Sequence, residues 1–232
     1  MQLFYQPDII KGDHFLDAEE SRHCIKVLRK REGDEINIVD GKGGSYKAII
    51  SDANHKKCSF TITETINSAL KNYSVHIAIA PTKNADRIEW FVEKAIEIGI
   101  DSITFIECEH SERGKVNLER LSKKAVSAMK QSLKSFLPDI NPLQSFKSFT
   151  ESVCADQKFI AYVDYSLPQH LKDAVNQKKD YVILIGPEGD FSTAEIDLAY
   201  KNGFKAVSLG KSRLRTETAG LASCHIFNLV ND

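Results

Sequence analysis

Two glycine-containing segments near the end of the chain have the residue types and spacing of a ligand site. The first, Leu184-Ile-Gly-Pro-Glu-Gly189, carries a buried strand directly into a Gly-Pro-Glu-Gly loop and then into a helix. In an open parallel sheet, ligands bind beyond the carboxyl ends of the strands, where this loop would lie. Gly186 and Gly189 would let the backbone approach a flat ligand, and Pro187 would stiffen the turn. A tight connection without a ligand explains this one segment equally well.

The second segment, Leu209-Gly-Lys-Ser-Arg-Leu-Arg-Thr-Glu-Thr-Ala219, also leads from a strand end into a helix. Two loops of similar character favour a shared pocket more than either does alone. Arg215 and Glu217 fall together at the start of the helix, where a structural ion pair or a capping contact is common. Neither loop has the spacing of a P-loop or of the dinucleotide glycine motif, so the sequence disfavours both kinds of site.

Two stretches concentrate positive charge, although the whole chain has a formal net charge of −1. The stretch from 22 to 31 contains no acidic residue, and its basic side chains are Arg22, His23, Lys26, Arg29, Lys30 and Arg31. The stretch from 113 to 134 holds seven basic residues against Glu119 alone. Such patches attract RNA phosphates, whereas a solvated helix face is the ordinary explanation of a charge run. Taken alone, His23 is best explained as a half-buried, hydrogen-bonded histidine.

From Tyr73 onwards strands alternate with helices, which predicts an α/β region with a parallel sheet and covered faces. The expected strands are residues 75–80, 103–106, 159–163, 182–185 and 207–209. The expected helices are residues 84–98, which Gly99 ends, 118–135 and 216–230. One more helix opens with the Ser192–Glu195 capping box and closes at Gly203.

The first seventy residues follow a β pattern. Residues 35–39 alternate apolar and polar side chains, residues 40–44 supply turn chemistry, and residues 45–51 and 59–63 continue the pattern. One helix, capped by Asp17, has Ile25 and Leu28 on its apolar side. We therefore expect a compact β-barrel or sandwich. With residues 67–72 as the linker, the domains span residues 1–70 and 73–232.

Composition and cysteine spacing limit the classes of protein. A chain of 232 residues with 42% hydrophobic and 27% charged residues is long enough and apolar enough for a real core. Five widely spaced cysteines without a CxxC pair indicate reduced thiols and no metal site. The N-terminus does not have the pattern of a signal peptide, and the longest apolar stretch, 181–185, is too short to cross a bilayer. We expect a cytoplasmic protein without a membrane partner.

Several ordered motifs together resemble one family. Near the end of the chain the motifs are residues 185–189 with Phe191-Ser192, residues 209–210 and residues 214–219. Earlier in the chain they are Pro81-Thr-Lys83, residues 93–99, Ser111-Glu-Arg113, and Gln131-Ser132 with Pro138. In this order they resemble the ribosomal small-subunit RNA (uracil-N3) methyltransferases of the SPOUT superfamily. His23, Val27-Leu-Arg29 and Gly33-Asp34 resemble the family's PUA-like RNA-binding domain. The resemblance covers nearly the whole chain.

The resemblance implies a PUA-like β-barrel followed by a SPOUT α/β domain with a deep trefoil knot around its parallel sheet. It implies an obligate homodimer and a bent S-adenosyl-L-methionine held by the knot loops. The matching cofactor contacts are Leu184, Ile185, Gly186, Pro187, Glu188, Gly189, Leu209, Gly210, Leu214, Arg215 and Thr216. The implied substrate is a uridine in the decoding region of 16S rRNA within the small ribosomal subunit, and the basic residues above, with Arg113, become candidate RNA contacts.

Three positions depart from the family pattern. Asp190 stands where the family usually has a second glycine, and Arg213 stands at a position that is normally apolar. Gln2 replaces an arginine that is often found beside the first phenylalanine. The first two departures bear on the pose of the cofactor, and the third bears on one RNA contact.

Methylation at uracil N3 needs an unpaired or flipped uridine that loses its N3 proton. Negative charge then spreads onto the carbonyl oxygens, and we expect Arg215 to stabilise it. Glu217 is expected to be either the base or the residue that orients Arg215.

Two other functions stay open. One is a SPOUT enzyme that acts on another RNA site, such as a transfer-RNA ribose or base; the N-terminal β-domain favours the uracil-N3 reaction over it. The other is a non-catalytic ribosome-assembly protein that binds RNA; the intact GPEG and LRTETA segments argue against that loss of turnover.

Overall fold

The computed structural model describes residues 2–112, 114–163 and 169–232, and the chain divides into two compact units. One unit comprises Met1–Leu70 with Val126–Leu137, and the other comprises Lys71–Ala125 with Pro138–Asp232. The sequence pattern groups residues 126–137 with the second region. They join the first unit through backbone pairing, because Gly43 N–H donates to the carbonyl of Ser135 and Leu137 N–H donates to the carbonyl of Gly41. Backbone pairing of this kind leaves no signature in the side chains.

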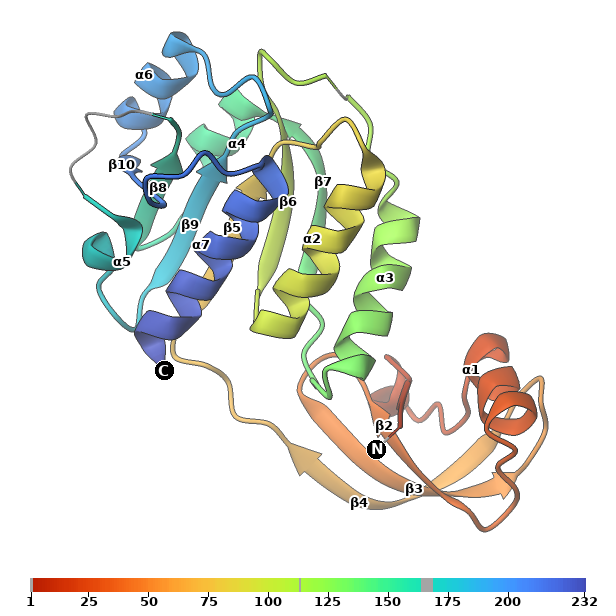
Figure 1. The fold of residues 1–232 in the computed structure, drawn as a ribbon. Coiled ribbons are helices and arrows are strands. Elements are labelled where there is room, and N and C mark those ends of the chain that lie inside the picture. The colour runs from red at the N-terminus through yellow and green to blue at the C-terminus, as the bar shows by residue number, and fades with distance from the viewer. Residues whose placement is uncertain (1, 113, 164–168) are drawn as a thin grey trace. The chain divides into compact units, whose positions relative to one another are not determined.

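Within the described residues, the first unit contains a four-stranded sheet in the order β1-β2-β3-β4 (Figure 1). Its strands are β1 (Leu3–Tyr5), β2 (Glu35–Val39), β3 (Gly44–Asp52) and β4 (Ser59–Asn67). β1 runs parallel to β2, and the other pairs are antiparallel. The strands expected at 35–39, 45–51 and 59–63 are confirmed as β2, β3 and part of β4. β1 is too short for a periodic pattern to reveal it.

The helix of the first unit begins where the capping pattern predicts. α1 (Ala18–Arg22) follows Asp17, whose carboxylate accepts a hydrogen bond from Glu20 N–H at 2.8 Å. The chain continues as a π-helix, η2 (His23–Val27), which buries Cys24 in the apolar core of the unit. The wider turn leaves Val27 and Leu28 exposed, so the apolar side expected at Leu28 is only partly realised.

The second unit, over the residues described, contains a six-stranded parallel sheet in the order β10-β8-β9-β5-β6-β7. Its strands are β5 (Ser74–Ile79), β6 (Ser102–Glu107), β7 (Asp139–Ser145), β8 (Gln157–Ala161), β9 (Asp180–Ile185) and β10 (Lys205–Val207). The predicted α/β class is confirmed. β10 ends two residues earlier than the strand expected at 207–209. β7 was not expected, because a half-buried edge strand with polar residues has no clear apolar pattern.

The helices of this unit are α2 (Ala85–Ile98), α4 (Phe146–Ser152), α5 (Leu171–Ala174), α6 (Thr193–Lys201) and α7 (Thr216–Asn231). α3 (Leu118–Gln131) contains the boundary between the two units. Gly99 ends α2 with a φ of 129°, as predicted, and the Ser192–Glu195 capping box that opens α6 is present. The short helices α4 and α5 were not predicted from the sequence pattern. None of the helices in the described ranges is long and apolar enough to cross a membrane.

Alternate residues of the central strands face two different helical layers (Figure 1). Ala78 and Ala80 of β5 pack with α4 and α6 in one core cluster. Ile79 faces the other layer, where α2 and α7 pack so closely that a side chain at Gly220 would meet Phe91. β9 lies between β8 and β5 and is apolar along its buried length, as expected for a strand covered on both faces. The carboxyl end of β9 is therefore held rigidly from both sides.

Candidate functional site

The two glycine-containing loops meet at the carboxyl edge of the parallel sheet. The hydroxyl of Thr216, the first residue of α7, donates a 3.0 Å hydrogen bond to the carbonyl of Gly186, directly after β9. Both residues are buried. The shared location predicted for residues 184–189 and 214–216 is thus what the tertiary structure produces.

The Gly-Pro-Glu-Gly loop is fitted closely to its neighbours. Gly186 and Pro187 are buried, whereas Glu188 and Gly189 are exposed. A Cβ at Gly189 would lie 2.9 Å from Cβ of His110 in the loop after β6, so only glycine fits there. The Glu188 carboxylate accepts a 3.4 Å hydrogen bond from the backbone N–H of Lys83, after β5. Three strand-terminal loops therefore define the position of this segment.

Asp190 occupies a backbone conformation that normally selects glycine, since its φ is 63°. Its side chain compensates by accepting hydrogen bonds from Phe191 N–H at 2.8 Å and from Val163 N–H at 3.0 Å. His110 also contacts its carbonyl, at 3.1 Å from the ring nitrogen Nδ1. The departure from the family's glycine thus has a local physical reason, and the turn is preserved.

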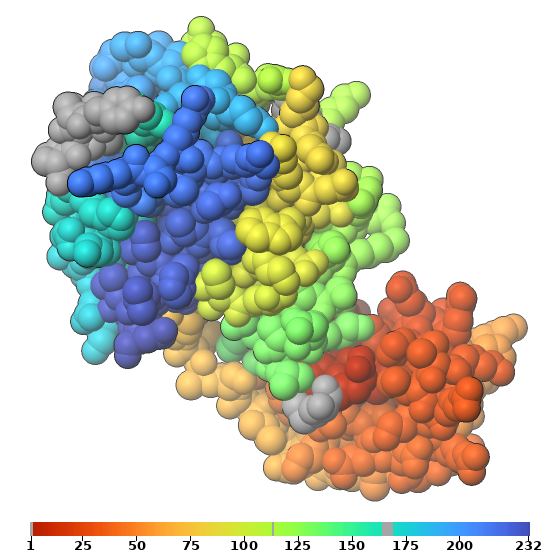
Figure 2. All heavy atoms as spheres, in the orientation of Figure 1, coloured from red at the N-terminus to blue at the C-terminus, as the bar shows by residue number. Residues whose placement is uncertain are grey.

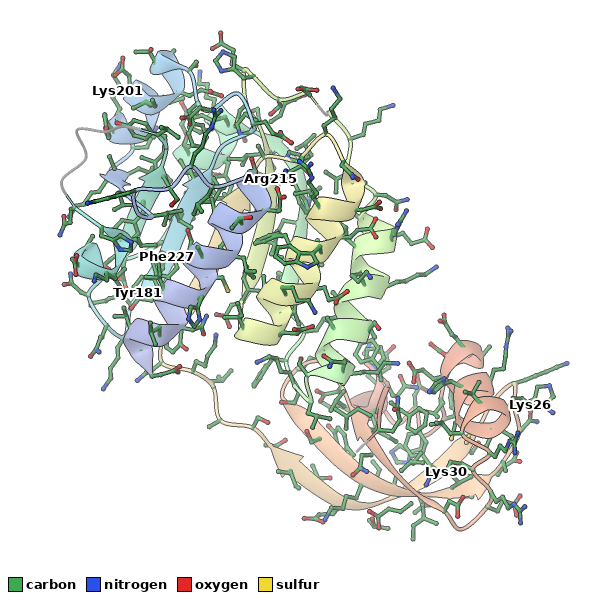
Figure 3. All side chains as sticks on the ribbon, viewed as in Figure 1. Lys26, Lys30, Tyr181, Lys201, Arg215 and Phe227 are labelled. Atoms are coloured by element: carbon green, nitrogen blue, oxygen red, sulfur yellow. The ribbon has the colours of Figure 1, made fainter. Side chains whose placement is uncertain are left out.

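The segment before α7 supplies the second wall of the site and lies on the surface as a blue ridge (Figure 2). Leu209 and Leu214 are half-buried. Gly210 has a φ of 119°, and no atom of the described residues lies within 4 Å of the place where its Cβ would stand. The N-cap of α7 is Arg215, whose side chain is exposed and makes no capping hydrogen bond (Figure 3). Space for a ligand therefore remains beside this loop.

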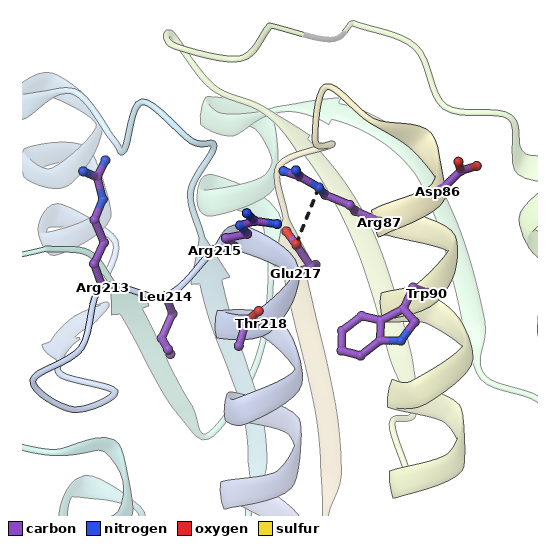
Figure 4. Close-up of a pocket in the computed structure, with 8 residues that line it drawn as sticks. All are labelled: Asp86, Arg87, Trp90, Arg213, Leu214, Arg215, Glu217 and Thr218. Atoms are coloured by element: carbon purple, nitrogen blue, oxygen red, sulfur yellow. Dashed lines mark ion pairs between the residues drawn. The ribbon is translucent and has the colours of Figure 1, made fainter.

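A cavity of about 540 Å³ lies between the N-terminal parts of α2 and α7 (Figure 4). This volume falls within the range of about 300–1,000 Å³ that small-ligand sites occupy. The cavity is lined by Asp86, Arg87, Trp90, Arg213, Leu214, Arg215, Glu217 and Thr218. Of the lining residues on the α7 side, Leu214, Arg215 and Glu217 were predicted as site residues from the sequence, whereas Thr218 and the residues of α2 were not. The available signal was that positions 86, 87 and 90 share one side of a helix that begins after the carboxyl end of β5.

Glu217 is the buried ionisable group of this cavity, and its side chain is only 8% exposed. Its Oε1 atom lies 3.8 Å from Nε of Arg87, the ion pair drawn in Figure 4. Its Oε2 atom is buried without a hydrogen-bond partner among the residues that the structure describes. The ion-pair partner of Glu217 is therefore Arg87 of α2, although the sequence brings Arg215 closest to it.

Two of the basic candidates of the first unit line a groove of about 940 Å³. Arg22 and His23 line it together with Gln2, Val27 and Lys130. Lys26, Arg29 and Arg31 are exposed, and Lys30 donates to the carbonyl of Glu35 at 3.1 Å (Figure 3). Arg29 has a φ of 57°, unusual for a residue other than glycine.

His23 is half-buried, with its ring edge-on to Phe4 at 6.3 Å between centroids. This is the packing expected of a histidine that helps to hold a domain together. Arg113, the remaining candidate RNA contact, lies outside the described residues. In the ranges that the structure describes, no group of three or more His, Cys, Asp or Glu side chains could hold a metal ion.

Comparison with protein families gives two matches that together span most of the chain. Residues 69–228 match the family described as an RNA methyltransferase domain. Residues 16–63 match the family described as an RNA methyltransferase PUA domain. Both matches fall where the structure places separate sheets.

Known relatives and solved structures agree with these matches. The ribosomal RNA small subunit methyltransferase E of Buchnera aphidicola is 28% identical, over 96% of this chain and 90% of its own. The protein of the same name from Bacillus subtilis is 26% identical, over 89% of this chain and 86% of its own.

Two crystal structures cover 100% of this chain and 98% of their own. A probable rRNA-methyltransferase from Porphyromonas gingivalis is 41% identical with a TM-score of 0.93. A Legionella pneumophila structure, in complex with the bound cofactor SAM, is 25% identical with a TM-score of 0.86.

Proposed function

The chain belongs to the RNA methyltransferase family, and from this premise we propose that it methylates N3 of one uridine in 16S rRNA of the small ribosomal subunit. The proposed methyl donor is S-adenosyl-L-methionine, and the proposed place of action is the cytoplasm. The relatives named ribosomal RNA small subunit methyltransferase E support this choice of RNA.

The observation that carries the proposal is the hydrogen bond between Thr216 and Gly186, which joins two ligand-type loops beside a cavity containing an arginine and a buried carboxylate. The proposed cofactor contacts are those inferred from the sequence, residues 184–189, 209–210 and 214–216. The exposed backbone at Gly189 and Gly210 could approach a flat nucleoside, and no described residue occupies the space beside Gly210. When bound, the cofactor supplies an electrophilic methyl group on a positively charged sulfur.

The protein's own contribution is positioning and electrostatics. The exposed Arg215 guanidinium stands at the mouth of the cavity, where it would stabilise negative charge on the uracil carbonyl oxygens. Glu217 would accept the N3 proton, since its Oε2 atom has no protein donor in the described part of the chain. A buried acceptor without a donor is costly, which makes a ligand donor the natural partner.

The first unit is proposed to bind the RNA as a PUA-like β-barrel. Arg22, Lys26, Arg29, Lys30 and Arg31 would contact phosphates, and His23 would order the segment that carries them. The bridge between Phe15 and Ser59 supports closure of the sheet, because it pairs a segment outside the four strands with β4. Arg113 is retained as a proposed RNA contact from the family resemblance.

Two larger features complete the proposal. After β10, at the edge of the sheet, the chain returns to place α7 on β5 and β9, a path that supports the trefoil knot. The homodimer is proposed from the family resemblance, and sedimentation velocity of the full chain would test it by its mass.

The proposed function is tested by incubating the protein with labelled S-adenosylmethionine and either 30S particles or naked 16S rRNA. A nucleoside digest should contain labelled 3-methyluridine from at least one substrate. Another methylated nucleoside would point to a different RNA site. A protein that neither binds the cofactor by calorimetry nor transfers label would be a non-catalytic RNA-binding protein.

A further inference from the structure

The cavity between α2 and α7 contains an aromatic surface in addition to its charged groups. Trp90, the single tryptophan of the chain, is 43% exposed and lines the cavity together with Thr218 (Figure 4). Exposed indole faces are the side-chain surfaces on which unpaired nucleobases stack, and each such stack contributes about 1–3 kcal/mol. The α2 side of the cavity thus has the character of a base-stacking wall.

The hydrogen-bonding pattern of the same cavity is directional. Glu217 offers a buried acceptor, Oε2, that no described donor satisfies. The guanidinium groups of Arg87 and Arg215, which are donors only, line the cavity with it. A carboxylate between two guanidinium groups is complementary to a ligand edge with a hydrogen-bond donor between two acceptors. The donor would face the carboxylate, and the two acceptors would face the guanidinium groups.

Among the pyrimidines, uracil has this edge: two carbonyl oxygens flank the N3 proton. Neutral cytosine instead presents a bare N3 acceptor, which a carboxylate would repel. Leaving buried polar groups unpaired is the strongest means by which a site rejects a near-isosteric ligand. Selection of uracil therefore depends on Glu217 presenting an acceptor to the N3 proton.

Arg87 is placed to orient the Glu217 carboxylate. Its Nε atom lies 3.8 Å from Oε1, and the carboxylate is more than nine-tenths buried. This contact engages Oε1 and leaves Oε2 without a donor among the described residues. Without the guanidinium, the carboxylate would lose its described ion-pair partner.

The other ionisable groups near Glu217 do not replace Arg87. Arg213 and Asp86 line the same cavity, and Asp86 forms an ion pair with Arg120 at 3.6 Å. His76 of β5 lies on the opposite face of the sheet from α7, where its ring contacts Thr104 and Phe149. β9 contributes Asp180 and Tyr181, at the end of the strand away from the loop.

We infer that this cavity is the pocket for the target base, in which uracil stacks on Trp90 and Arg87 acts as a positioning residue that holds the Glu217 carboxylate ready for the N3 proton. The inference rests on the proposed function and deepens it. It assigns base selection to α2, an element outside the two loops proposed for the cofactor.

The first test uses the fluorescence of Trp90, which is free of background from other tryptophans. The full-length protein is titrated with single-stranded oligouridylate and, separately, with oligocytidylate of equal length. Stacking should quench the fluorescence. The apparent affinity should be at least about tenfold higher for oligouridylate than for oligocytidylate, and a tenfold difference corresponds to about 1.4 kcal/mol of binding free energy. Glu217→Gln should abolish the preference, because an amide can donate to cytosine N3. Absence of quenching by both, or equal affinity for both in the unaltered protein, would overturn the inference.

The second test compares Arg87→Ala, Arg87→Lys and the control Lys94→Ala, which removes a cation that pairs with Glu97 on the same helix at 2.8 Å. In methylation assays Arg87→Ala should lower kcat without changing the KM for the methyl donor. Arg87→Lys should recover most of the rate, and Lys94→Ala should match the unaltered protein.

A purely structural role would lower the activity and the thermal stability of Arg87→Ala together and would change kcat and the KM for the methyl donor alike, and that result would refute the assignment. If the unaltered protein makes no 3-methyluridine, the proposed function fails. The fluorescence preference still decides whether the pocket recognises uracil.

Discussion

Each unit of the molecule buries one glutamate whose carboxylate is only half satisfied. In the first unit, Glu20 forms an ion pair with Lys130 through Oε1, and its Oε2 atom has no described partner. In the second unit, Glu217 pairs with Arg87 in the same manner. Both carboxylates are about nine-tenths buried, so the two sites differ in their partners more than in their burial.

The difference lies in what each pair connects. Lys130 is itself only 19% exposed and comes from the segment 126–137, so its contact ties α1 to a returning stretch of the chain. Arg87 is 36% exposed, holds Glu217 at 3.8 Å, and faces a cavity at the carboxyl edge of a parallel sheet. Glu20 and Lys130 also line a groove, that of the first unit, so open space adjoins both pairs. The pairs differ in position, because Lys130 belongs to a returning segment of the chain and Arg87 lies on a helix beside the carboxyl edge of the parallel sheet. We therefore expect a structural role for the first pair and a ligand-facing role for the second.

The largest expected effect tests the structural half of this comparison. Lys130→Met leaves Glu20 buried and uncompensated, which should lower the free energy of unfolding of the first unit by about 3–5 kcal/mol. Urea denaturation followed by circular dichroism measures it. The double variant Glu20→Gln with Lys130→Met should regain most of the loss. A cost below about 1 kcal/mol would place the pair among ordinary surface ion pairs.

His76 sharpens the comparison, because it is half-buried and has no ionic partner among the residues that the structure describes. Burial lowers its pKa to about 4, from about 6.5 in an unfolded chain. The folded protein keeps this ring neutral, so its contribution to stability is complete above about pH 6.5 and is lost as the pH falls toward 4. The loss should be about 3 kcal/mol by linkage.

Urea denaturation at pH 7 and at pH 4 measures this term as the difference between the unaltered protein and His76→Gln. The variant should lose less stability on acidification, because it has no group to protonate at that site. Equal losses would mean that the histidine is solvated or charged in the fold.

Glu217→Gln tests the catalytic half of the comparison. Loss of the proposed proton acceptor should lower kcat by about a hundredfold, or about 2.7 kcal/mol of barrier. The temperature of unfolding should stay constant or rise, since a buried carboxylate with one unsatisfied oxygen has been replaced by a neutral amide. A variant that loses stability instead of rate would show that Glu217 and Glu20 have the same structural role.

The smallest expected effect concerns the exposed charges of the first unit. Arg29→Glu should weaken RNA binding and reduce the slope of log affinity against log salt by about 1. Binding of S-adenosylmethionine, measured by calorimetry, should not change. The control Lys56→Glu reverses an exposed charge of the same unit outside the basic stretch. Equal RNA affinity for both variants and the unaltered protein would count against Arg29 as a contact.

Features that depend on residues close together in the chain could be predicted from the sequence. The capping residues Asp17 and Ser192, the helix end at Gly99 and the strand-to-loop junction at Gly186 each follow from local backbone chemistry. The alternation of strands and helices was sufficient for the α/β class. Elements shorter than one period, such as β1 and α5, left no comparable pattern.

The sequence by itself determined the parallel sheet, the two loops at its edge, and the presence of an arginine and a glutamate at the start of the last helix. Only the tertiary structure decided that Glu217 pairs with Arg87, that Trp90 faces the same cavity, and that residues 126–137 return to the first unit. The physical reason is that caps and periodicity act between near neighbours in the chain. Ion-pair partners and cavity walls depend instead on the order of strands in the sheet. The sequence around a carboxylate therefore does not indicate which distant cation will pair with it.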